Sequence, residues 1–163
     1  MKTQNQIMLI KLGYILTLIT VVLFSLTDMA RGFEDGYADG GNGGVFGLIH
    51  GTLILIISFF CLRVLLYLYR FIDSVQVGNV FSEENTSRLK RMGWYCTAIP
   101  FLLFIFNAMD YVRASGNDEN LTLKIIQNVD FQFWLLIFGL TLLTIAFVFK
   151  KGIELKQEHD LTV

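Results

Sequence analysis

Proline, cysteine and histidine are scarce in this chain: its 163 residues include one proline, two cysteines and two histidines. The cysteines, Cys61 and Cys96, lie in apolar surroundings without C-x-x-C spacing, so we expect no disulfide framework. The histidines form no H-E-x-x-H or comparable metal pattern, and there is neither a G-x-S-x-G motif nor a phosphate-binding glycine loop. Because nothing assembles a nucleophile, a base and an orienting group, we expect no cofactor and no enzymatic activity.

Charge is also sparse, at 17% of the residues against 54% that are hydrophobic, and the mean hydropathy is +0.57. A soluble domain of this size would be about a quarter charged. The apolar residues gather into runs that would each measure about 30 Å as a helix, the thickness of a bilayer core. The runs are residues 7–26, 45–69, 94–112 and 131–149. The sequence therefore predicts an all-α integral membrane protein, a single domain over 1–163 that forms a four-transmembrane-helix bundle. The first run exceeds the usual length of a signal-peptide core and has no small-x-small cleavage site, so we expect it to be retained.

Lysine and arginine are unevenly distributed between these runs, and this asymmetry predicts orientation. The N-terminus, the segment 70–93 and the tail 150–163 together carry eight basic residues, whereas the other two loops carry three. Both termini and the middle segment should therefore be cytoplasmic, with the two acidic loops outside. The glycine-rich stretch EDGYADGGNGG in the first outer loop lacks the ligand spacing and closing glutamate of an EF-hand, so we expect a linker there.

The polar stretch GNVFSEENTSRLKRMGW, residues 78–94, separates the second and third runs. Gly78 is typical of a helix end, and Ser82 is a good N-cap. Glu83 and Glu84 follow in the first turn, where the helix dipole favours anions. We expect the second and third spans to continue into a cytoplasmic helical hairpin, residues 70–93, with a turn at about 78–82. Pro100 should kink the third span by removing a backbone hydrogen bond.

The same stretch and the tail resemble a known family. The pattern G-x-x-F-[ST]-x-x-N-x-x-x-L-[KR]-x-[IM]-G matches Gly78, Phe81, Ser82, Asn85, Leu89, Lys90, Met92 and Gly93. A closing D-L-T-[VI] matches Asp160, Leu161, Thr162 and Val163. In these motifs the chain resembles a bacterial family of small four-span membrane proteins, domain of unknown function 2975. Members are often encoded beside a small helix-turn-helix regulator. The resemblance therefore implies a protein of the bacterial cytoplasmic membrane that binds or controls such a regulator, and it implies no catalytic residue.

Two sets of candidate functional residues follow. The hairpin and tail would supply a docking surface formed by Phe81, Ser82, Asn85, Arg88, Leu89, Lys90, Asp160, Leu161 and Val163. Ionisable groups inside a membrane are costly and need an explanation. The candidate ionisable residues in the spans are Arg63, His50 and Asp110, and the polar amide Asn107 is grouped with them. His50 and Asp110 should meet between helices, either as a site for a proton or cation or as a polar tether. Lys11 and Arg63 can snorkel toward the headgroups.

The leading hypothesis is a non-enzymatic regulatory or sensory membrane protein that docks a cytosolic partner such as a helix-turn-helix regulator. The alternatives are a small channel or transporter, an accessory subunit of a membrane complex, and a chaperone-like protein that shields another membrane protein. In a further reading, the hairpin only fixes topology. The expected partners are the lipid bilayer, the regulator and, through the G-x-x-x-G pair Gly47 and Gly51, a second copy of the chain. Direct binding of nucleic acid is not expected.

Overall fold

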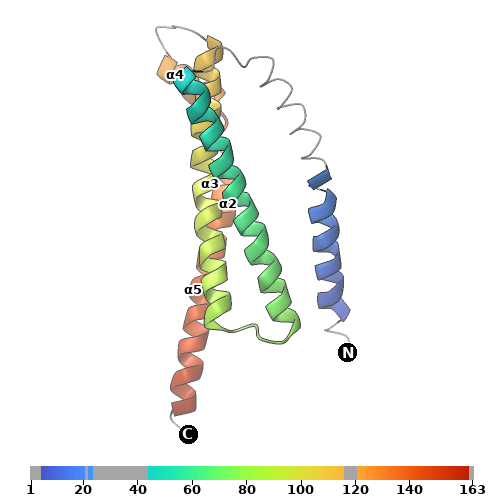
Figure 1. Cartoon of the computed structure of the whole chain (residues 1–163). Coiled ribbons are helices and arrows are strands. Elements are labelled where there is room, and N and C mark those ends of the chain that lie inside the picture. The colour runs from blue at the N-terminus through green and yellow to red at the C-terminus, as the bar shows by residue number, and fades with distance from the viewer. Residues whose placement is uncertain (1–4, 21, 24–43, 116–120, 162–163) are drawn as a thin grey trace.

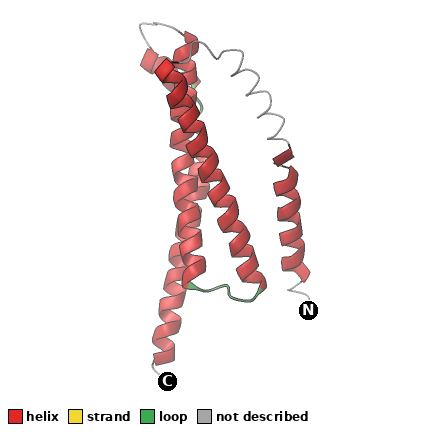
Figure 2. Ribbon diagram, in the orientation of Figure 1, coloured by secondary structure: helices red, strands yellow, loops and turns green. Residues whose placement is uncertain are grey.

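The computed structural model describes residues 5–20, 22–23, 44–115 and 121–161, and all regular structure in these ranges is helical (Figure 2). An N-terminal helix covers Asn5–Thr20. It is followed by α2 (Gly44–Gln76), α3 (Glu83–Ser115), α4 (Leu121–Asn128) and α5 (Phe133–Leu161). The predicted all-helical fold is confirmed. The glycine-rich acidic loop lies outside the described residues.

Three of these helices are long and apolar enough to cross a membrane: Ile49–Gln76, Glu83–Arg113 and Phe133–His159. They contain the predicted third span, 94–112, and all but the first few residues of the predicted second and fourth spans, 45–69 and 131–149. The predicted first span, 7–26, begins inside the N-terminal helix, but residues 21 and 24–26 lie outside the described residues. The structure thus establishes three helices of membrane-crossing length, and the four-span bundle remains a prediction.

The central element is α3, which packs against α2 on one side and against α5 on another (Figure 1). Within the described residues, the backbones of α2 and α5 do not lie close to each other. The two helices meet through side chains, for example through the rings of Phe71 and Phe149, whose centroids are 6.3 Å apart. The helix α3 continues through Pro100, whose side chain is fully buried. Figure 1 places the start of the N-terminal helix, the α2–α3 turn and the end of α5 at the same end of the molecule.

The closest packing joins α3 to α5 through glycines. A Cβ added at Gly139 would lie 2.6 Å from the Thr97 hydroxyl oxygen and 2.7 Å from the Thr97 backbone nitrogen. A Cβ at Gly93 would lie 2.7 Å from Cγ of Leu143. Small residues at these positions let the two backbones approach closely, as is common between helices in membranes. These contacts, Gly93 against Leu143 and Gly139 against Thr97, form the glycine seam, and their close fit sets the register of α5 against α3.

The buried core is small and lies near the hairpin end. Its buried members are Tyr67, Leu89, Met92 and Ala146, with Leu68, Phe71, Tyr95, Leu142 and Phe149 packed against them. Many large apolar side chains elsewhere are exposed, including Leu55 at 71% and Trp134 at 84%. A water-soluble surface would rarely carry so many apolar side chains, whereas lipid tails solvate them without cost.

Polar contacts hold the N-terminal helix beside α2. The Lys11 ammonium donates to Oδ1 of Asp73 at 2.5 Å and to Oε1 of Gln76 at 3.2 Å. The Tyr14 hydroxyl donates to the Leu65 carbonyl at 2.7 Å. Lys11 was expected to snorkel alone, and instead it has a carboxylate partner near the end of α2.

The sequence interpretation missed the short helix α4, which was taken as loop. Val129, just after α4, is buried. The ring of Phe131 packs against Phe101 and Phe104 of α3, with centroids 5.3 and 6.0 Å away. These contacts bring the chain back to α3 before α5 begins.

Candidate functional site

The α2–α3 turn begins with a complete Schellman arrangement. The Asn79 amide donates to the Ser74 carbonyl, and the Gly78 amide donates to the Val75 carbonyl, each at 3.0 Å. Gly78 has φ +86°, a left-handed conformation that glycine adopts without the steric cost of a Cβ. The prediction that Gly78 ends the helix is confirmed.

Ser82 caps α3 as predicted. Its hydroxyl oxygen accepts from the Asn85 amide at 3.2 Å, and its carbonyl accepts from the Thr86 amide at 3.0 Å. Glu83 and Glu84 occupy the first turn. The expected turn at about 78–82 thus agrees with the structure, in which α2 ends at Gln76 and α3 begins at Glu83.

Asn85 closes the turn from inside. Its side-chain amide nitrogen lies within hydrogen-bonding distance of three acceptors: the Asn79 carbonyl at 2.7 Å, the Ser74 hydroxyl at 3.0 Å and the Val80 carbonyl at 3.1 Å. Its oxygen accepts from Nη1 of Arg88 at 2.9 Å. With 0% of its surface exposed, Asn85 joins the end of α2, the turn and the start of α3.

Arg88 extends this network. Its Nη1 also donates to the Arg70 carbonyl at 3.1 Å, and its Nη2 forms an ion pair with Glu84. Leu89, the next residue, is buried in the core. Burial gives Asn85 and Leu89 a role inside the hairpin, although the sequence had placed both on the docking surface. The polar pattern could not distinguish a side chain that faces a partner from one that faces the chain's own carbonyls.

A polar groove of about 470 Å³ lies between the first turns of α3 and the last turns of α5. It is lined by Glu83, Thr86, Ser87, Lys90, Lys150, Ile153, Glu154 and Gln157. Glu154 lies 2.6 Å from the Lys151 ammonium and 3.7 Å from that of Lys150. The hydrogen bond from Lys151 lowers the pKa of this carboxyl below its ordinary value. The groove therefore presents charges of both signs.

Phe81, at 63%, is an exposed aromatic residue at this end. One side of its ring packs on Phe149 of α5, with 4.9 Å between centroids. The helix α5 runs to Leu161, so Asp160 and Leu161 belong to this helix. Val163 lies outside the described residues. Of the predicted docking residues, Phe81 and Lys90 are thus exposed near the groove.

The polar residues in the spans are only partly brought together. Nδ1 of His50 and Oδ1 of Asp110 lie 3.5 Å apart, and the His50 ring lies 4.1 Å from that of Phe106. Asn107 lies one turn before Asp110 with a half-buried side chain. Arg63 is about 20 Å farther along α2 from His50. Its guanidinium lies 5.1 Å from the centre of the Phe59 ring, so it belongs to a separate region.

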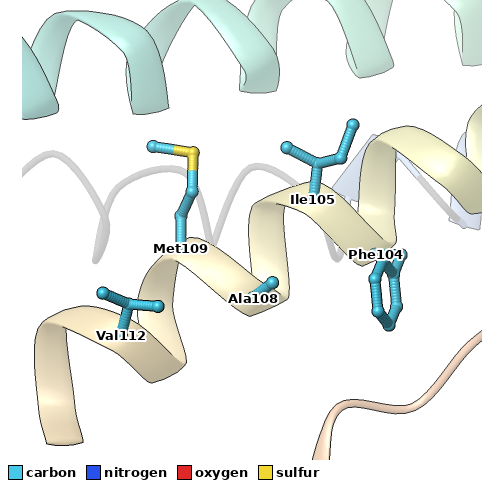
Figure 3. Close-up of a pocket in the computed structure, with 5 residues that line it drawn as sticks. All are labelled: Phe104, Ile105, Ala108, Met109 and Val112. Carbon is cyan, nitrogen blue, oxygen red and sulfur yellow. The ribbon is translucent and has the colours of Figure 1, made fainter. Parts of the chain in front are cut away.

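An apolar hollow of about 290 Å³ on α3 is lined by Phe104, Ile105, Ala108, Met109 and Val112. Ile105 and Met109 point toward α2, whereas Phe104 points to the opposite side (Figure 3). Because its lining offers no polar group, this hollow has no means of holding a polar ligand. Among the described residues, no three His, Cys, Asp or Glu side chains are placed to hold a metal ion.

The sequence interpretation overlooked the α5 half of the groove. Lys150, Ile153, Glu154 and Gln157 follow i, i+3, i+4, i+7 spacing and so share one face of α5. That periodicity was visible in the sequence. Which element the face meets depends on the register of α5 against α3, and the glycine seam sets that register.

Comparison with known proteins identifies a family. A family model described as Protein of unknown function (DUF2975) matches residues 45–163. Neither a curated protein nor a solved structure matches the chain.

Proposed function

Because the chain belongs to the DUF2975 family, whose function is unknown, we propose from its own geometry that it is a non-enzymatic regulatory membrane protein. It docks a cytosolic protein on the groove between α3 and α5. The observation that carries the proposal is the ordered polar end of the molecule. There a hydrogen-bonded turn fixes the start of α3, and the Gly93 and Gly139 contacts together with the Phe81–Phe149 ring contact place α5 beside it.

The length of α5 supports this proposal. Its 29 residues measure about 43 Å, whereas a bilayer core needs about 30 Å. About two turns or more therefore project beyond the membrane. A topology signal alone requires basic residues near the span, not an ordered groove.

The proposed partner is a helix-turn-helix regulator, on the strength of the family resemblance. The groove suits a polar protein surface because Lys90 and Lys150 stand near Glu83 and Glu154. Such mixed charges favour specificity and register in docking more than affinity. On the predicted orientation, this end faces the cytoplasm of a bacterial cell.

Crosslinking in native membranes tests the proposal. The full-length chain and a variant with Lys90→Glu and Lys150→Glu are compared, with Lys156→Glu as the control. Lys156 lies on α5 but does not line the groove. Capture of a helix-turn-helix regulator by the wild type and by the control, with loss in the double variant, is the expected result. Equal capture by all three proteins, or capture of membrane proteins alone, would contradict docking on this groove.

A second candidate function, a small channel, a transporter or an accessory subunit, rests on the His50–Asp110 pair at 3.5 Å. Such a pair offers a proton site near one end of α2 and α3. Proton flux into liposomes, measured for the wild type and for Asp110→Asn, tests it. Identical flux for the two proteins would remove this candidate.

A further inference from the structure

Arginines of α2 and α3 lie near one tyrosine, Tyr67, at the contact between these two helices. Arg63, Tyr67 and Arg70 are spaced i, i+4, i+7, so they follow one face of α2. From α3, Nη1 of Arg91 donates to the Tyr67 hydroxyl at 3.1 Å. The Arg91 guanidinium carbon lies 5.8 Å from the centre of the Tyr67 ring. Arg91 thus contacts the hydroxyl directly, and Arg63 and Arg70 lie about one turn to either side of Tyr67 on the same face of α2.

Within the described residues, Arg63, Arg70 and Arg91 form no ion pair with a carboxylate, although Asp73 lies one turn after Arg70 on α2. The nearby acids are engaged elsewhere: Glu84 pairs with Arg88, and Asp73 pairs with Lys11. Like charges that stand close together repel, and the repulsion grows where water is excluded. The cluster is therefore suited to an anion that the chain itself does not supply.

The hydroxyl of Tyr67 completes a set of donors. It accepts from Arg91, which leaves its own proton to donate. Only 7% of the Tyr67 surface is exposed, so the hydroxyl is held in place. Guanidinium groups bind phosphate oxygens through paired hydrogen bonds, for which a fixed neighbouring donor is a natural complement.

The position of the cluster indicates the kind of anion. Arg63 lies seven residues before Arg70, which places it about 10 Å deeper in the apolar part of α2. Trp94, one turn after Arg91, is exposed, as tryptophan often is at a membrane interface. The exposed side chains of Leu62 and Leu66 lie on α2 near the same depth. The ligand should therefore carry negative charge at one end and hydrocarbon at the other.

We propose that Arg70, Arg91 and Tyr67 bind the phosphate of an anionic phospholipid, with Arg63 as a deeper cation that snorkels toward the same headgroup. The lipid tails lie along the exposed apolar side of α2. Basic pockets between membrane helices on the cytoplasmic side are known to hold such headgroups. The site lies on a different face from the groove of the proposed docking function and does not depend on it.

The test compares two double variants of equal charge in the full-length protein. Arg70→Gln with Arg91→Gln removes the cluster, whereas Lys90→Gln with Lys150→Gln removes two cations from the groove. Each protein is purified in a neutral detergent and titrated with phosphatidylglycerol or phosphatidylcholine. Native mass spectrometry measures the retained lipid, and the thermal midpoint measures the stabilisation.

We expect wild type and the groove variant to retain phosphatidylglycerol in preference to phosphatidylcholine. The cluster variant should bind it at least about 25-fold more weakly, since each basic residue at an anionic surface contributes about a fivefold factor. Arg70→Lys with Arg91→Lys keeps the charge but loses the paired hydrogen bonds. A midpoint unchanged in phosphatidylcholine shows that this variant is folded, and it should then bind phosphatidylglycerol more weakly than wild type.

Three outcomes would overturn the site. Equal loss of phosphatidylglycerol in the cluster and groove variants would mean unspecific attraction to an anionic surface. Full binding by the lysine variant would exclude a guanidinium site. Equal stabilisation by inorganic phosphate would show that the lipid is not the ligand.

Discussion

Replacing Asn85 with alanine tests whether the hairpin is held by one buried side chain. The change removes the amide nitrogen that faces Ser74, Asn79 and Val80, and the oxygen that faces Arg88. An amide nitrogen has two protons, so it supplies two full hydrogen bonds among three acceptors. Neutral hydrogen bonds contribute about 1 kcal/mol each, and one to a charged group contributes about 2 kcal/mol. The expected loss in the free energy of unfolding is therefore about 4 kcal/mol.

The assay is equilibrium unfolding in detergent micelles, followed by circular dichroism. Asn79→Ala is the matched control, because Asn79 takes part in the turn through its backbone and its side chain is exposed. Ser82→Ala gives an intermediate reference, since loss of an N-cap costs about 1 kcal/mol. The reasoning is refuted if Asn85→Ala costs no more than Asn79→Ala.

Three other substitutions probe the packing. Gly139→Ala places a methyl group against the backbone of α3, so we expect a loss of about 1–3 kcal/mol in unfolding free energy. Gly51→Ala is the control and should be neutral or stabilising, because the space around Gly51 is open. Equal effects of the two substitutions would contradict the close contact between α3 and α5. Gly78→Ala forces a left-handed conformation on a residue with a Cβ and should cost about 1 kcal/mol by the same assay, and an unchanged midpoint would exclude the observed turn. A double-mutant cycle on Lys11 and Asp73 should give a coupling much weaker than the loss expected for Asn85→Ala, because both side chains are partly exposed. A coupling as large as that loss would mean that lipid shields the pair from water.

Features set by neighbouring residues could be predicted from the sequence. Gly78 and Ser82 end one helix and begin the next through hydrogen bonds that span at most six residues, and the residue types alone indicate them. The pairing of His50 with Asp110 was also anticipated, because both lie near the same end of their apolar runs.

Features set by the register between helices could not be predicted. Asn85 appeared to be a surface residue because its acceptors are carbonyls that converge only after the turn has closed. The seam at Gly139 depends on which residues of α3 stand opposite, and one sequence does not specify this. The helix α4 is only eight residues long, too short for its apolar pattern to stand out from a loop.

The locked turn also has a consequence for the order of assembly. The hydrogen bonds that close it join residues between Arg70 and Arg88, so they need nothing from α5. Contacts between near neighbours in the chain form quickly, and elements fold as they emerge during synthesis. The hairpin can thus be completed while α5 is still being translated. The helix α5 can then pack against a finished hairpin, with its position set by the glycine seam, so docking of α5 follows closure of the turn.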